Sequence, residues 1–252
     1  MPVLRTKTSR MWLPDALRGL ALLNMLAYHA MYDWVYVFGH ESSWYNIWAL
    51  GCHVWQQYIC WSFILLSGFS FPLAKRPAKN GLIVAGCAAV LTFVTAVFMP
   101  SEAIWFGVLH LNAAAVLLTC LVYPLLQRLP AGAGLAASAA LFALTNQLPE
   151  GYLGFENWRL CAVPAGLYRA NLFWLGLPDL TRFKSADYFP VVPWVFLFWC
   201  GVFLARLWRP GRGEPPAALR PLCAIGRNTL LVYMLHQPVI YGALWVWHTV
   251  LG

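Results

Sequence analysis

The chain has 252 residues, of which 61% are hydrophobic and only 10% are charged, and its formal net charge is +8. A soluble domain carries about 25% charged residues, so this composition excludes an ordinary soluble protein and indicates an integral membrane protein. The positive charge does not indicate nucleic-acid binding, because the basic residues cluster in short loops between apolar stretches and form no basic stripe.

Seven apolar stretches are long enough to cross a bilayer, which takes about 20 residues. Proline, glycine or charged residues separate them. The sequence therefore predicts an all-α polytopic bundle of about seven transmembrane helices, forming a single domain over residues 1–252. The stretches are 13–33, 48–74, 81–99, 104–126, 131–148, 191–208 and 224–248.

The distribution of Lys and Arg among the loops predicts the orientation of this bundle. With seven spans, one side of the membrane receives most of the basic residues and the other receives most of the acidic ones. Cytoplasmic loops are enriched in Lys and Arg, so we expect the N-terminus inside and the C-terminus outside. The basic side holds Arg5, Lys7, Arg10, Lys75, Arg76, Lys79, Arg128, Arg206, Arg209, Arg212, Arg220 and Arg227.

The segment 149–190 does not resemble a simple connection between two spans. It mixes apolar stretches with proline, glycine and charged residues. Long loops in compact proteins are commonly functional, so we expect this segment to form an outer-face loop or a cap over a cavity.

The first apolar stretch contains the ionisable residues Asp15, Arg18 and His29, which are costly to insert into a bilayer and mark a functional site. Eleven residues make almost three helical turns, so Arg18 and His29 share one helix face, about 16 Å apart. Asp15 and Arg18 either neutralise each other or leave Arg18 to bind an anionic group such as a phosphate. Arg227, at the cytoplasmic start of the last stretch, either helps to bind that anion or extends to lipid headgroups.

Two further histidines lie in other apolar stretches. His110 lies a few residues into the fourth stretch, and His236 lies near the middle of the seventh. A neutral histidine is an effective general base near pH 7, so we expect His29, His110 and His236 to line one polar cavity. The alternative is that each ring hydrogen-bonds a neighbouring helix in a structural role. The seven cysteines form no CxxC pair and no acidic residue or cysteine accompanies the histidines at ligand spacing, so we expect no metal site.

Asp187 precedes the sixth apolar stretch on the predicted outer side, within the sequence DYFPVVPW at 187–194. It either caps the following helix, or holds a polar acceptor or orients a catalytic histidine. Both interpretations remain open from the sequence.

Six motifs occur in order over almost the whole chain and together resemble a known family. The family comprises bacterial proteins similar to the catalytic domain of heparan-α-glucosaminide N-acetyltransferase, in the wider transmembrane acyltransferase superfamily. The resemblance implies transfer of an acetyl or other acyl group from cytosolic acyl-CoA to a hydroxyl or amine of a sugar-like acceptor outside the bacterial inner membrane. The motifs are 15–21 with His29, 63–68, 106–110, 187–194, 226–227 and 236–238.

The same resemblance implies roles for individual residues. His29 becomes a general base or a transient acyl nucleophile, and Arg18 and Arg227, with Asp15 beside them, become the binding site for CoA. His110 and His236 then orient or polarise the thioester, and Asp187 orients the acceptor or His29. In the lysosomal sugar acetyltransferase the catalytic histidine lies in the first outer loop before a tryptophan, which makes His40, with Trp44, the alternative to His29.

Two other classes of protein compete with this interpretation. A transporter or proton-linked permease would use the same histidines as a relay, although no inverted repeat is visible in the sequence. A non-catalytic assembly or signalling subunit would show no turnover. The partners expected for the enzyme are acyl-CoA, a carbohydrate-like acceptor and the lipid bilayer, but no nucleic acid, and homo-oligomerisation is left open.

Overall fold

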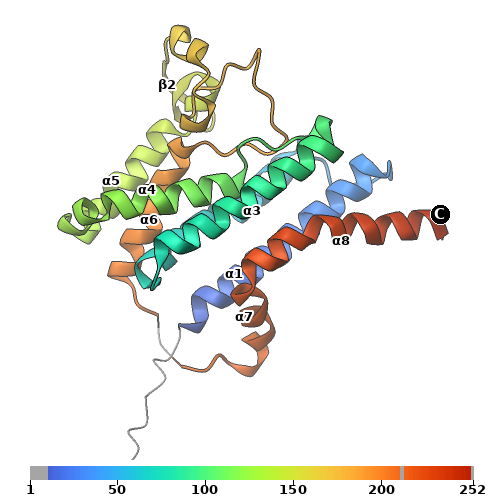
Figure 1. Ribbon diagram of the computed structural model, residues 1–252, viewed down its shortest axis with the longest axis horizontal. Coiled ribbons are helices and arrows are strands. Elements are labelled where there is room, and N and C mark those ends of the chain that lie inside the picture. The colour runs from blue at the N-terminus through green and yellow to red at the C-terminus, as the bar shows by residue number, and fades with distance from the viewer. Residues whose placement is uncertain (1–10, 211–212, 251–252) are drawn as a thin grey trace, which may run out of the picture. The chain divides into compact units, whose positions relative to one another are not determined.

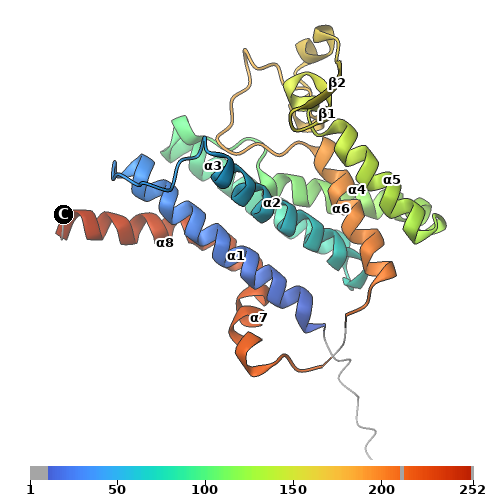
Figure 2. The same cartoon turned by 180° about the vertical axis from the view of Figure 1, so that it is seen from behind.

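The structure is a computed structural model, and it describes residues 11–210 and 213–250. The chain is mostly helical, as the sequence predicts (Figures 1 and 2). A helix covers most of each predicted apolar stretch. The elements in chain order are α1 (Trp12–Tyr32), α2 (Leu50–Ser70), α3 (Pro77–Phe98), α4 (Val108–Arg128), α5 (Ala131–Thr145), β1 (Tyr152–Phe155), β2 (Trp158–Ala162), α6 (Val191–Leu207), α7 (Arg220–Arg227) and α8 (Thr229–Val250).

Three of the described helices, α3, α4 and α8, are long and apolar enough to cross a membrane. Helices α1 and α2 have 21 residues each, but polar groups such as Asp15, Arg18 and Gln57 lower their hydropathy. Helix α6 is apolar but has only 17 residues. The count of about seven spans and the inside–outside orientation therefore stay predictions. Four residues used for the orientation, Arg5, Lys7, Arg10 and Arg212, lie outside the described residues.

The contacts divide the chain into two compact units, and the boundary falls within α2. The first unit combines the residues before Ile64 with those after Trp208, and the second runs from Ile64 to Trp208. The single domain expected over residues 1–252 stays a prediction.

In the first unit, α1 packs along α7 and α8 (Figure 1). The crossing with α7 is close because a glycine from each helix lies at the contact. A Cβ added at Gly19 would lie 2.0 Å from the carbonyl oxygen of Leu222, and one at Gly226 would lie 1.9 Å from that of Asp15. Only residues without a side chain allow the two backbones to approach this closely.

The core of the first unit follows one face of α1. Leu22 and Met25 are buried there together with Ile59 from α2, and Tyr233 from α8 packs against them. Their spacing of three to four residues continues the line from Asp15 through Gly19 to His29. Because α1 is one unbroken α-helix between Trp12 and Tyr32, Arg18 and His29 do share a face, as their spacing predicts.

The second unit is held together around α6. Gly201 of α6 and Gly68 of α2 lie against each other's helix, and a Cβ at either position would lie about 2 Å from a backbone oxygen. The indole of Trp199 donates a hydrogen bond to Thr119 of α4 (3.0 Å). The guanidinium of Arg206 donates to the carbonyls of Leu126, Gln127 and Leu129, so it caps the C-terminal end of α4.

The segment 149–190 contains more structure than a bare loop. Strands β1 and β2 form an antiparallel hairpin with Tyr152 opposite Ala162, and short 3₁₀ turns follow it. The hairpin and α7 were not predicted from the sequence. The class is thus mostly helical rather than strictly all-α, and the proposed capping role of this segment stays a prediction.

The close crossing of α1 and α7 makes a prediction about stability. Gly226→Ala places a methyl group inside backbone contact distance, so we expect it to cost about 1–3 kcal/mol and to lower the melting temperature by several degrees. Gly242→Ala is the matched control, because that glycine also lies within a helix of this unit and nothing lies within 4 Å of its added Cβ. A Gly226→Ala protein that melts with the wild type in detergent would contradict the close crossing.

Candidate active site

A buried carboxylate joins two arginines where α1 meets α7. The side chain of Asp15 is only 3% exposed, and it accepts hydrogen bonds from Arg18 Nη1 to Oδ1 (3.0 Å) and from Arg227 Nε to Oδ2 (3.3 Å). The Arg18 side chain is 17% exposed and that of Arg227 is 44% exposed. The structure thus brings together the three residues expected to bind CoA. Two guanidinium groups and one carboxylate give these three side chains a summed charge of +1.

This geometry gives the three residues different roles. Asp15 accepts a hydrogen bond from each arginine and so fixes the positions of their guanidinium groups, whereas its own negative charge would repel a phosphate. Arg227 is the more exposed of the two and lies at the end of α7, so it has the freedom to turn toward a ligand. The glycine at 226 allows this arrangement, because it brings the end of α7 against the backbone of Asp15.

Further along α1, His29 meets His236 of α8. The centroids of the two rings are 4.8 Å apart, and the ring planes are inclined by 61°. Neither nitrogen of the His29 ring has a hydrogen-bond partner among the described residues. The structure therefore brings together two of the three histidines that the sequence singled out.

The hydrogen bonding of His236 sets its tautomer. Its Nδ1 lies within hydrogen-bond distance of the carbonyl oxygen of Tyr233, and a carbonyl only accepts, so Nδ1 carries the proton. In the neutral ring Nε2 then has a lone pair, and this buried atom has no partner among the described residues. An unpaired buried acceptor costs about 1–3 kcal/mol. His236 thus presents a buried, unprotonated ring nitrogen, which is the group that a general base requires.

Two residues beside the histidines were not identified as a pair from the sequence. Asp33 is 1% exposed, and the Gln237 side-chain amide donates hydrogen bonds to both of its carboxylate oxygens (2.9 Å each). The sequence held a signal, because Asp33 lies four residues after His29 and Gln237 directly follows His236. That signal could not be used without knowing that α1 and α8 are neighbours.

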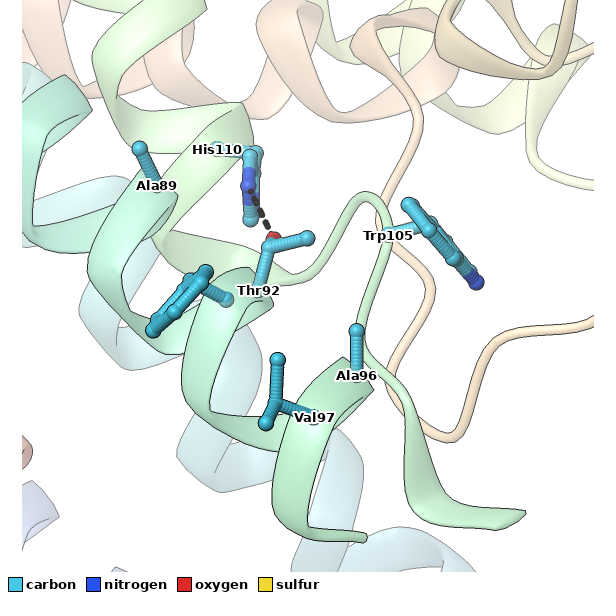
Figure 3. Close-up of a pocket in the computed structure, with 7 residues that line it drawn as sticks. Ala89, Thr92, Ala96, Val97, Trp105 and His110 are labelled. Carbon is cyan, nitrogen blue, oxygen red and sulfur yellow. Dashed lines mark hydrogen bonds between the residues drawn. The ribbon is translucent and has the colours of Figure 1, made fainter. Parts of the chain in front are cut away.

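His110 belongs to the second unit, and both of its ring nitrogens are hydrogen-bonded. Figure 3 shows the bond to Thr92. The Thr92 hydroxyl donates to the carbonyl of Ile104 (2.7 Å), so it accepts from His110 Nε2 (3.0 Å). His110 Nδ1 then accepts from the backbone N–H of Gly107 (3.3 Å) at the start of α4. This geometry favours a positioning role for His110. The expected cavity lined by three histidines stays a prediction beyond the pair of His29 and His236.

His110 and Thr92 lie on the wall of a shallow, open pocket of about 480 Å³ in the second unit (Figure 3). The other lining residues are apolar or aromatic. Because both ring nitrogens of His110 are hydrogen-bonded within the protein, the pocket offers an apolar surface and no free imidazole nitrogen. Its lining is Ala89, Thr92, Phe93, Ala96, Val97, Trp105 and His110.

Asp187 also lies at the start of α4. Its Oδ2 accepts a hydrogen bond from the backbone N–H of Val108 (3.1 Å), and a Cβ at Gly107 would lie 2.4 Å from the same oxygen. The sequence allowed Asp187 to cap the helix that follows it, but Pro190 holds that N-cap position, and Asp187 caps α4 instead. Burial of this carboxyl raises its pKa to about 6, although the hydrogen bond from Val108 opposes the shift.

His40, the alternative catalytic histidine, lies in the loop after α1. Its ring stacks on Trp34 with centroids 3.8 Å apart, and its edge contacts His248 at 5.7 Å. Its Nε2 is buried and lacks a hydrogen-bond partner among the described residues. His40 therefore keeps a ring nitrogen without a partner, but its ring contacts are with Trp34 and His248 rather than with the pair of His29 and His236.

No group of three or more His, Cys, Asp or Glu side chains is arranged to hold a metal ion in residues 11–210 and 213–250.

Three helices long and apolar enough to cross a membrane indicate an integral membrane protein, and α1, α7 and α8 carry its paired polar residues. A family model described as heparan-alpha-glucosaminide N-acetyltransferase, catalytic, matches residues 10–238. The chain belongs to this family, which indicates a membrane acetyltransferase, as the resemblance of its motifs implies. A comparison with curated proteins finds no match, and neither does a comparison with solved structures.

The raised pKa of Asp187 makes a prediction about pH. Below about pH 4 the Asp187 carboxyl is protonated in both the folded and the unfolded protein. Between about pH 4 and pH 6 the unfolded protein loses this proton more readily than the folded protein, so the free energy of unfolding falls as the pH rises. We expect the melting temperature of the wild type, relative to Asp187→Asn, to fall between pH 4 and pH 7, by an equivalent of up to about 3 kcal/mol.

Asp179→Asn serves as the control for this titration. Hydrogen bonds from Thr181 lower the pKa of Asp179, so the carboxylate stays ionised and its difference from Asn should stay flat between about pH 5 and pH 8. If the melting temperature of the wild type instead rises relative to that of Asp187→Asn as the pH increases, the pKa of Asp187 is not raised.

Proposed function

We propose that the protein transfers an acetyl or other acyl group from cytosolic acyl-CoA to a hydroxyl or amine of a sugar-like acceptor on the outer side of a bacterial inner membrane. The family supports acetyl transfer in a membrane. The observation that carries the proposal is the contact between His29 and His236, because it places two imidazoles at the interface of two helices, with Nε2 of His236 buried and without a partner among the described residues.

The reaction step follows from the tautomer of His236. Its Nε2 takes a proton from the acceptor hydroxyl or amine while that oxygen or nitrogen attacks the thioester carbon. Collapse of the tetrahedral intermediate breaks the bond between carbon and sulfur, and the proton held by the imidazolium passes to the departing thiolate. His29, in ring contact with His236, either shares this proton or attacks the thioester first as a nucleophile.

The donor is proposed to bind at the opposite end of the same face of α1. Arg18 and Arg227, positioned by Asp15, would hold the phosphates of CoA. Arg18 and His29 are about 16 Å apart along the helix axis, so an extended pantetheine arm would run along α1 toward the histidines. The roles that the resemblance implies for His110 and Asp187, which belong to the second unit, stay predictions.

The direct test is release of free CoA when the purified protein receives acetyl-CoA and glucosamine. We expect turnover by the wild type, and a loss of kcat of at least about 100-fold in His29→Ala and in His236→Ala, since a positioned general base contributes 10²–10⁴-fold.

His53→Ala is the control variant, because His53 belongs to α2 and no role in the reaction is proposed for it. Loss of turnover in His40→Ala with full activity in His29→Ala would transfer the catalytic role to His40. Movement of glucosamine into vesicles without release of CoA would instead support the transporter.

The donor site makes a separate prediction. Arg227→Gln removes a charge-assisted contact, so we expect the KM for acetyl-CoA to rise about tenfold with a smaller effect on kcat. Arg220→Gln is matched to it, because Arg220 begins the same helix and pairs with the exposed Glu214. Equal KM values for the two variants would exclude Arg227 from the donor site. Stabilisation of the protein by increasing acetyl-CoA provides an independent binding measurement.

A further inference from the structure

Two consecutive residues of α8 each present a buried hydrogen-bond acceptor without a partner among the described residues. They are His236, through Nε2, and Gln237, through Oε1. Both residues also contact the segment that runs through the end of α1, His236 through the ring of His29 and Gln237 through the carboxylate of Asp33, which begins the π-helical turn Asp33–Val37 directly after α1. Positions 29 and 33 are about one helical turn apart, so His236 and Gln237 contact neighbouring residues of this segment.

The orientation of the Gln237 amide depends on Asp33. A carboxylate oxygen only accepts hydrogen bonds, so the amide nitrogen must face Asp33 and the amide oxygen must face away. In the described part of the chain, Gln237 is the one hydrogen-bond partner of this carboxylate. Asp33 therefore determines which end of the amide is presented to the rest of the site.

A purely structural pair of Asp33 and Gln237 does not account for the open acceptors. Buried polar atoms in folded proteins are nearly always hydrogen-bonded, and exceptions mark a ligand, a water or a strained functional group. Here two exceptions occur at consecutive residues, and both are acceptors. Each lacks a hydrogen-bond donor, which a single molecule with two donor groups could supply.

We propose that Asp33 and Gln237 form a clamp for the acceptor substrate, and that the clamp selects molecules with donor groups on adjacent carbons. Gln237 Oε1 accepts a hydrogen bond from a hydroxyl, and His236 Nε2 accepts one from the hydroxyl or amine on the neighbouring carbon. The second group is the one that becomes acylated, a step that rests on the proposed function. The substrate class is thus a vicinal diol or amino alcohol, as on a sugar ring, and Asp33 is a positioning residue.

Two small probes that differ in one hydroxyl test the clamp without any acyl transfer. Trans-2-aminocyclohexanol has a hydroxyl beside its amine, and cyclohexylamine does not. The affinity of the purified full chain for each probe follows from the dependence of its melting temperature on probe concentration. We expect the wild type to bind the amino alcohol about tenfold more tightly, because one further buried acceptor is satisfied.

The variants separate positioning from simple stability. In Asp33→Asn the new amide can donate to Gln237, so the Gln237 amide is free to turn over, and we expect most of the tenfold preference to disappear. Gln237→Met should lose it as well, and the double variant should lose no more than either single variant, since both changes remove one interaction. Asp33→Glu keeps a carboxylate and should recover part of the preference.

Asn24→Ala is the control for structural damage. It removes the hydrogen bond that Trp55 donates to Asn24 between α1 and α2 (2.9 Å) and should keep the full preference. Equal binding of the two probes by the wild type, or an unchanged preference in Asp33→Asn and Gln237→Met, would overturn the clamp. Acyl transfer plays no part in these measurements, so failure of the proposed function would appear only as absence of CoA release.

Discussion

The close crossing of α1 and α7 is the constraint on which the described site depends. Gly19 and Gly226 remove the side chains that would hold the two backbones apart. As a result α7 ends with Arg227 against Asp15, and α8 begins two residues later along the same face of α1. The positions of His236 and Gln237 opposite His29 and Asp33 follow from that start. The two glycines at this crossing thus place both Arg227, in the proposed donor site, and His236, in the proposed site of acyl transfer, against α1.

Hydrogen-bond satisfaction distinguishes residues of the same type in this protein. His110 uses both ring nitrogens on Thr92 and Gly107, and Asp187 caps the start of α4, so both residues support local structure in the second unit. His236 uses one nitrogen and leaves the other buried and open, and Gln237 does the same with its amide. In an apolar environment an open acceptor is costly, so it is retained only where a ligand or water completes it. This difference is why the proposed chemistry is placed on α1 and α8.

Much of the fold followed from the sequence because apolar length and punctuation are local properties. The helices lie close to the predicted stretches, and the shared face of Arg18 and His29 follows from the period of one unbroken helix. Two elements were missed for local reasons as well. The hairpin at 152–162 has only four and five residues per strand, and α7 is a short helix of eight residues that ends at Arg227, because the backbone leaves helical geometry at Asn228. Neither element has the length that makes periodicity readable.

By itself the sequence determined the family, the helices and the residue types available for chemistry, since each of these depends on order and spacing along the chain. The tertiary structure decided which of those residues meet. It joined Asp15 to both Arg18 and Arg227, paired His29 with His236, and assigned His110 and Asp187 to the start of α4. The pair of Asp33 and Gln237, 204 positions apart, was equally out of reach. The physical reason is that a hydrogen bond between distant segments depends on which helix faces pack together, and the period of one helix carries no information about its neighbour.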